Sequence, residues 1–95
     1  MGSIADPILI DLLEEKISIF PNPFYHDLEI AIETKERGGA KILIYNMLSQ
    51  VVFEDTFKIN SDAAVLKINP AITSGVYLLQ LQINGKVIIE KIIKN

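Results

Sequence analysis

The stretch Ser74–Lys94, which reads SGVYLLQLQINGKVIIEKIIK, determines the expected fold more narrowly than any other part of the sequence. In its first half, large apolar side chains alternate with glutamines, and this period of two is typical of a strand with one buried face. Asn84-Gly85 follows, and both residues tolerate the positive φ angles of a two-residue hairpin turn. The stretch therefore predicts an antiparallel hairpin whose last strand covers residues 86–94. The row expected to face the core is Tyr77, Leu79, Leu81 and Ile83.

The last strand of this hairpin is apolar on both faces. Val87, Ile89 and Ile93 share one face with Lys91. The other face carries Ile88 and Ile92 together with Lys86, Glu90 and Lys94. Such a strand is covered on both sides, contains a bulge that shifts its phase, or keeps an exposed strip for a partner. The sequence leaves these alternatives open.

Upstream of the hairpin, short alternating segments are separated by residues that favour turns. We expect turns at Arg37-Gly38-Gly39, at 46–49 and at 60–62. About seven short strands in roughly 80 residues predict an all-β fold, an Ig-like antiparallel β-sandwich, with a closed barrel as the alternative. The side chains expected to point inward from these segments are Ile17, Ile19, Leu28, Ile30, Ile32, Ile42, Ile44, Val51, Phe53, Ala64, Leu66 and Ile68.

The domain organisation follows from length and from the first residues. A chain of 95 residues fits one domain, which we expect to span 16–95. Residues 1–15 are interpreted as a tag remnant and linker, because the opening Met-Gly-Ser is typical of an expression tag. Residues 4–15 either form a short helix starting near Asp6 or an extended linker, and both remain open.

Composition excludes several classes of protein. Hydrophobic residues make up 49% of the chain, too many for a disordered tail. The net charge is −3 and the pI about 5.0, whereas a nucleic-acid-binding surface needs clustered positive charge. No apolar run is long enough to span a membrane as a helix. The chain has no cysteine, so it forms no disulfide and performs no thiolate chemistry.

The sequence contains no recognisable catalytic set. His26 is the only histidine, and it has no neighbours with the spacing of metal ligands or of a catalytic triad. Glu54 and Asp55 are adjacent on an expected strand, so they point to opposite faces. A weak Ca²⁺ site on Asn60 and Asp62 remains an alternative, but ordinary turn chemistry explains these residues better. We therefore expect no enzyme activity, no metal and no cofactor.

Three blocks of sequence, in order, resemble the type A C-terminal sorting domain of the type IX (Por) secretion system. The first, 19–24, reads IFPNPF and is similar to the aromatic-Pro-Asn-Pro signature near the start of that domain. The second, 41–52, is similar to its central strand-turn-strand block, although Ser49 stands where members usually carry glycine. The third combines Ser74–Leu81, a following hairpin and a basic, aliphatic end, Lys91–Asn95.

This resemblance implies a function in export. Such a domain is a non-catalytic signal that directs a cargo, fused on its N-terminal side, from the periplasm through the type IX outer-membrane translocon. The domain is then removed by a sortase-like surface protease, and the cargo is secreted or attached to the cell surface. A generic Ig-like or fibronectin-like adhesion or carbohydrate-binding module is the alternative.

The candidate recognition residues lie in the three blocks. Two prolines remove N–H donors and are expected to end a strand, and the tyrosine is expected to point inward with its hydroxyl at the rim. The lysines either protect an edge strand or are read by the export machinery. An exposed terminal hairpin also makes a homodimer through that hairpin possible. The candidates are Pro21, Asn22, Pro23, Gly75, Val76, Tyr77, Gly85, Lys86, Lys91 and Lys94.

Overall fold

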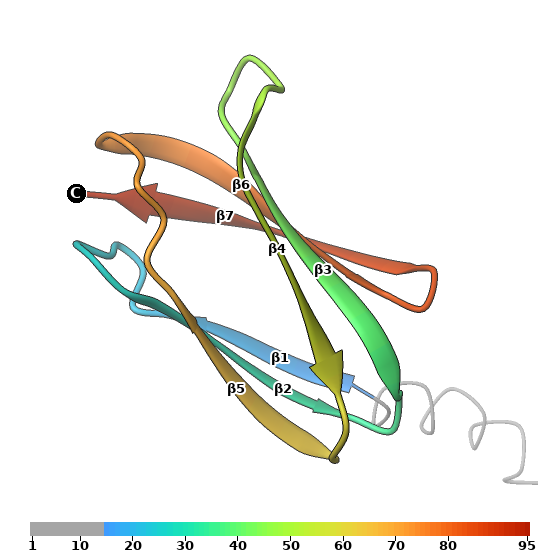
Figure 1. Cartoon of the computed structure of the whole chain (residues 1–95). Helices are drawn as coiled ribbons and strands as arrows, with labels where there is room; N and C mark the ends of the chain where they lie inside the picture. Colours follow the sequence, from blue (N-terminus) through green and yellow to red (C-terminus); the bar gives the residue numbers. More distant parts are fainter. Residues whose placement is uncertain (1–14) are drawn as a thin grey trace, which may run out of the picture.

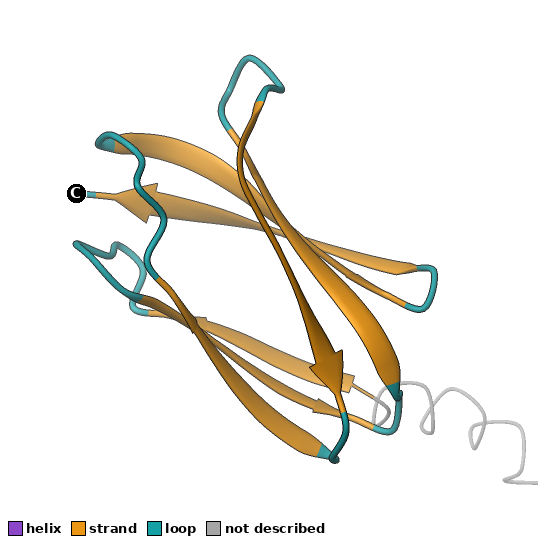
Figure 2. Cartoon of the chain, in the orientation of Figure 1, coloured by secondary structure: helices purple, strands orange, loops and turns teal. Residues whose placement is uncertain are grey.

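The computed structural model describes residues 15–95, and its regular structure there is entirely β-strand (Figures 1 and 2). A three-stranded antiparallel sheet has the order β1-β2-β5, and a four-stranded one has the order β4-β3-β6-β7. No helix in this part of the chain could cross a membrane. The strands are β1 Glu15–Phe20, β2 Leu28–Thr34, β3 Gly38–Tyr45, β4 Val51–Ile59, β5 Ala63–Ile68, β6 Gly75–Ile83 and β7 Lys86–Lys94.

The two sheets form the sandwich that the strand pattern predicted, and the closed-barrel alternative is wrong. The chain passes between the sheets after β2, after β4 and after β5, while β3–β4 and β6–β7 are hairpins within one sheet. The edge strands are therefore β1 and β5 in one sheet and β4 and β7 in the other. Edge strands leave half of their backbone hydrogen-bonding groups unpaired by the sheet.

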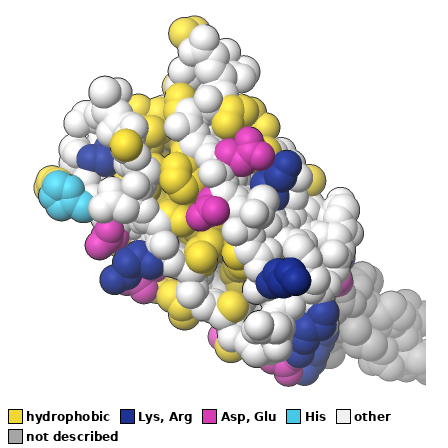
Figure 3. Space-filling view, viewed as in Figure 1, with side chains coloured by type: hydrophobic (Ala, Val, Ile, Leu, Met, Phe, Trp, Pro, Cys, Tyr) yellow, Lys and Arg dark blue, Asp and Glu magenta, His cyan; other side chains and the backbone are white. Residues whose placement is uncertain are grey.

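The core lies between the central strands of the two sheets. The rows expected from the sequence, Leu28, Ile30 and Ile32 on β2 and Tyr77, Leu79, Leu81 and Ile83 on β6, are all buried. These side chains alternate with exposed or half-buried ones, because successive residues of a strand point to opposite faces. Figure 3 shows apolar side chains along the side of the molecule between β4 and β5. Partly buried residues packed against the core include Phe53, Phe57, Leu66 and Ile72.

The terminal hairpin has the geometry that its sequence predicted. β6 and β7 pair without interruption from Gly75 opposite Lys94 to Ile83 opposite Lys86. The two turn residues have positive φ angles, 46° at Asn84 and 84° at Gly85. Positive φ at both central residues is the signature of the turn type that matches the twist of a two-stranded ribbon.

Two expectations were wrong in detail. The turn expected at Arg37-Gly38-Gly39 lies earlier, because both glycines already pair with β4 as the first residues of β3. Val51, expected to point inward, is half-exposed. The register between β3 and β4 shifts at this point, where Ile44 pairs with Phe53 and Tyr45 with Val51. A bulge of this kind places an extra residue in one strand and disturbs the alternation of faces.

Ser49 lies in the central turn, at the position where the resemblance leads to an expectation of glycine. Ser49 has a φ of 64°, a conformation that costs a residue with a side chain about 1–2 kcal/mol. The side-chain oxygen of Asn46 accepts hydrogen bonds from the backbone N–H of Leu48 at 2.9 Å and of Gln50 at 3.0 Å. These bonds hold the turn closed.

The interpretation of residues 1–15 as tag remnant and linker, and the alternatives for 4–15, concern a segment that lies, apart from Glu15, outside the described residues.

Replacing Leu79 with alanine should lower the free energy of unfolding by about 2–5 kcal/mol, because the side chain is fully buried and leaves a cavity. Urea unfolding followed by circular dichroism measures the loss. The matched control is Val65→Ala on the exposed face of β5, for which we expect a change below about 0.5 kcal/mol. Similar losses for the two variants would show that the core face is wrongly assigned.

Candidate functional site

The residues singled out from the sequence gather at the two ends of the β6–β7 hairpin. At one end, β6 begins and β7 finishes beside the segment Pro21–Phe24, which follows β1 (Figure 1). The other end is the hairpin turn, with Gly85 and Lys86. The candidates near the first end are Pro21, Asn22, Pro23, Gly75, Val76, Tyr77, Lys91 and Lys94.

Asn22 joins the beginning of the domain to its end. Its side-chain Nδ2 donates a hydrogen bond of 2.9 Å to the carbonyl oxygen of Lys91, and its Oδ1 accepts one of 2.9 Å from the N–H of Ile93. An amide side chain suits this position, because it offers a donor and an acceptor together and so mimics the backbone of a pairing strand. Asn22 therefore occupies part of the free edge of β7.

Phe24 extends the same contact by one residue pair. Its N–H donates to the carbonyl oxygen of Ile93 at 2.9 Å, and its carbonyl oxygen accepts from the N–H of Asn95 at 2.8 Å. The ring is fully buried in the core, and the ammonium of Lys94 lies 5.8 Å from its centroid. We call the segment Pro21–Phe24 the latch, because it covers the end of β7.

The prolines keep the latch out of the three-stranded sheet. β1 ends at Phe20, and Pro21 and Pro23 offer no N–H with which β2 could continue the ladder. Both prolines follow cis peptide bonds. The expected end of the strand is confirmed. The contact with β7 was not anticipated, since the sequence indicates a bend without indicating what packs against it.

The start of β6 is held by the tyrosine that the sequence singled out. The hydroxyl of Tyr77 donates a hydrogen bond of 2.6 Å to the carbonyl oxygen of Thr73 and lies 3.2 Å from its Oγ1. The buried ring passes 3.7 Å from where a Cβ on Gly75 would lie. That distance is an ordinary van der Waals contact, so the φ of 157° at Gly75, and not a lack of space, favours glycine at the turn into β6.

Polar contacts attach the hairpin turn to the β2–β3 connection. Asn84 Nδ2 donates to the carboxylate of Glu36 at 2.7 Å and to the carbonyl oxygen of Arg37 at 3.0 Å. The ammonium of Lys86 lies 3.2 Å from the same carboxylate. The hydrogen bond from Asn84 and then that from Lys86 lower the pKa of Glu36. Both ends of the hairpin are thus tied to the body of the domain.

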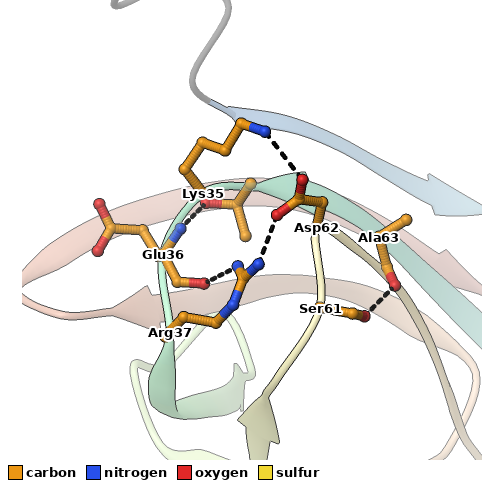
Figure 4. Close-up of polar contacts among 7 residues, drawn as sticks. Lys35, Glu36, Arg37, Ser61, Asp62 and Ala63 are labelled. Atoms are coloured by element: carbon orange, nitrogen blue, oxygen red, sulfur yellow. Dashed lines mark hydrogen bonds and ion pairs between the residues drawn. The ribbon is translucent and has the colours of Figure 1, made fainter.

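A second polar cluster joins the β2–β3 connection to the β4–β5 turn (Figure 4). Lys35 binds one carboxylate oxygen of Asp62 at 2.8 Å, and Arg37 binds the other. Arg37 first, and then Lys35, lowers the pKa of Asp62 to about 2. Both carboxylate oxygens of Asp62 therefore bind cations of the β2–β3 connection, and not backbone groups of their own turn as the sequence predicted. Among residues 15–95, no group of His, Cys, Asp or Glu is arranged to hold a metal ion.

The sequence left three alternatives for β7: cover on both faces, a bulge, or an exposed strip. The outer face of the hairpin distinguishes between them. The register with β6 contains no bulge, and no described segment covers this face. Val87 and Ile89 are 51% and 58% exposed, and Val76 and Leu78 on β6 are also exposed. The opposite face of β7 is anchored by Ile92, which is fully buried. The third alternative therefore holds. The exposed strip consists of Val76, Leu78, Val87 and Ile89, and Lys91 lies within it.

The model of one protein family, described as the secretion system C-terminal sorting domain, matches residues 18–95. The chain belongs to this family. A comparison with curated proteins gave no match. The family is the C-terminal sorting domain of type IX secretion, as the three sequence blocks indicated. It is a family of sorting signals and not a catalytic one, and it implies an N-terminal cargo and export to the cell surface or beyond.

Sequence reasoning missed two features of this site. It named Asn22 and Lys91 without predicting the contact between them, and it did not count Phe24, whose buried ring and paired backbone anchor the latch, among the candidates. A phenylalanine directly after Pro-Asn-Pro, on an expected loop, was the available signal, because large aromatic side chains are usually buried.

Replacing Asn22 with alanine removes both side-chain hydrogen bonds of the latch. We expect the free energy of unfolding to fall by about 1–3 kcal/mol, the usual contribution of two hydrogen bonds at an accessible site. Urea unfolding measures it. Asn60→Ala, an exposed asparagine in the β4–β5 turn, is the control and should change stability by less than about 0.5 kcal/mol. Equal effects of the two substitutions would contradict the role of the latch.

Proposed function

We propose that this domain is the signal that carries a cargo, fused on its N-terminal side, from the periplasm through the outer-membrane translocon of the type IX system. A sortase-like surface protease then removes the domain, and the cargo is released or attached at the cell surface. The observation that carries this proposal is the family match over 18–95, which contains the whole terminal hairpin.

The terminal hairpin is the part of the domain best suited to be recognised by the translocon. It presents exposed aliphatic side chains and the ammonium group of Lys91 on one face, and the half-buried Lys94 lies at the end of β7 on the other face, over the ring of Phe24. Exposed apolar side chains that lie together on neighbouring strands are suited to contact a partner. The strip is also held rigidly, because the latch and the Glu36 contacts fix the two ends of the hairpin.

The remaining candidate residues support this presentation. Asn22 holds the end of β7, Pro21 and Pro23 end β1 and so free the latch for this contact, and the Gly75–Tyr77 segment shapes the start of β6. Gly85 and Lys86 shape and anchor the turn between the strands. In this proposal only the lysines near the end of β7 and the exposed strip contact the translocon, and the other residues set their positions.

Reversing Lys91 and Lys94 to glutamate should retain a periplasmic reporter fused to residues 15–95, with export reduced about tenfold or more. A misplaced like charge at an interface costs several kcal/mol. Surface-protease accessibility in a host with type IX secretion measures export, and a urea melt of the purified domain checks the fold. Substitution is preferable to deletion of 91–95, because deletion would also remove the buried Ile92 and the partners of the latch.

The matched control reverses Lys58 and Lys67, two exposed lysines on β4 and β5, and so makes the same change in net charge. We expect this control to be exported as the unaltered domain is. Export of the Lys91/Lys94 variant at the normal rate would contradict the proposed role of the basic end of β7. Failure of the unaltered domain to export the reporter would favour a generic adhesion or carbohydrate-binding module.

A further inference from the structure

The free edge of β7 is divided into a covered half and an open half. In an antiparallel strand, alternate residues direct both backbone groups to the same side. Ile93 bonds the latch through its N–H and its carbonyl oxygen, so it faces the free edge. Ile89 and Val87, four and six residues earlier, therefore face the same edge. Ile88 and Ile92 face β6 instead.

The open half carries backbone groups that no described segment bonds. β7 pairs only with β6 among the strands of residues 15–95, and the latch reaches no further back than the carbonyl oxygen of Lys91. The N–H and C=O groups of Val87 and Ile89 and the N–H of Lys91 are left facing outward. Such a row is a template for another extended chain.

The side chains of the open half also select what can pair with it. Three residues direct their backbone groups to the free edge and their side chains to the exposed face of β7. They are Val87, Ile89 and Lys91. A strand added at this edge places its own side chains about 5 Å from these three. An aliphatic or aromatic residue fits opposite Val87 and Ile89, and an acidic residue complements Lys91.

We propose that the translocon binds this domain by adding a short extended segment to the open edge, Val87–Lys91. The segment is apolar opposite Val87 and Ile89 and acidic opposite Lys91. The latch limits its length, because Asn22 already bonds the carbonyl oxygen of Lys91 and the N–H of Ile93. This inference rests on the proposed function and specifies the contact through which the signal is read.

A proline at Ile89 tests the contact directly. Proline deletes one N–H and is tolerated in edge strands where that N–H faces solvent. Ile89→Ala is the matched control, because it removes the same side chain and keeps the N–H. With the reporter fused to residues 15–95, we expect Ile89→Pro to be exported about tenfold less than Ile89→Ala, the factor that corresponds to one lost hydrogen bond of about 1.4 kcal/mol. Circular dichroism confirms that both variants are folded.

The outcomes separate the possible explanations. Equal export of the two variants overturns the strand-addition contact and leaves the proposed function intact, whereas no export of the unaltered domain overturns both. If Ile89→Pro does not fold, Val87→Pro repeats the test nearer the turn. If neither folds, these N–H groups are not free and the inference is wrong. A dimer of the purified domain that Ile89→Pro dissociates, with normal export, would identify the occupant as a second copy and contradict the proposal.

Discussion

Two side-chain and two backbone hydrogen bonds join the latch to the end of β7, across separations of 69 and 71 residues in the chain. The latch continues from β1 in the three-stranded sheet, whereas β7 is the edge of the four-stranded sheet. These bonds therefore link the two sheets and the two ends of the described domain at one point. Phe24 adds a buried ring to the same link, so the contact is part of the core as well as of the edge.

The position of the latch determines which parts of the hairpin remain accessible to a partner. Ile92 and the uninterrupted pairing with β6 hold one face of β7 against the core, and the latch covers the last backbone groups of its edge. The outward side chains and the first half of the edge stay accessible. A sorting signal benefits from this arrangement, because its exposed part is limited to a few residues and is held at both ends.

The sequence was sufficient to predict the local elements, but it did not predict the contacts between them. Period-two alternation and Asn84-Gly85 predicted the hairpin, since both depend on neighbouring residues alone. The misplaced turn at Gly38 arose because glycine is compatible with either a turn or a strand end, and Val51 was misassigned because a bulge has no sequence signature here. Asn22 and Lys91 were both singled out, but their contact depends on the way the two sheets pack. For β7, only the observed register showed which apolar face is exposed.

Amide hydrogen exchange followed by NMR tests the division of the β7 edge most directly. Ile93 and Ile89 are the same residue type, lie on the same strand and face the same edge, and only Ile93 is bonded by the latch. We expect the amide of Ile93 to exchange about a hundredfold more slowly than that of Ile89, because a bonded amide exchanges only when the structure opens. Equal exchange of the two amides would contradict the account, since the edge would then be uniformly open or uniformly covered.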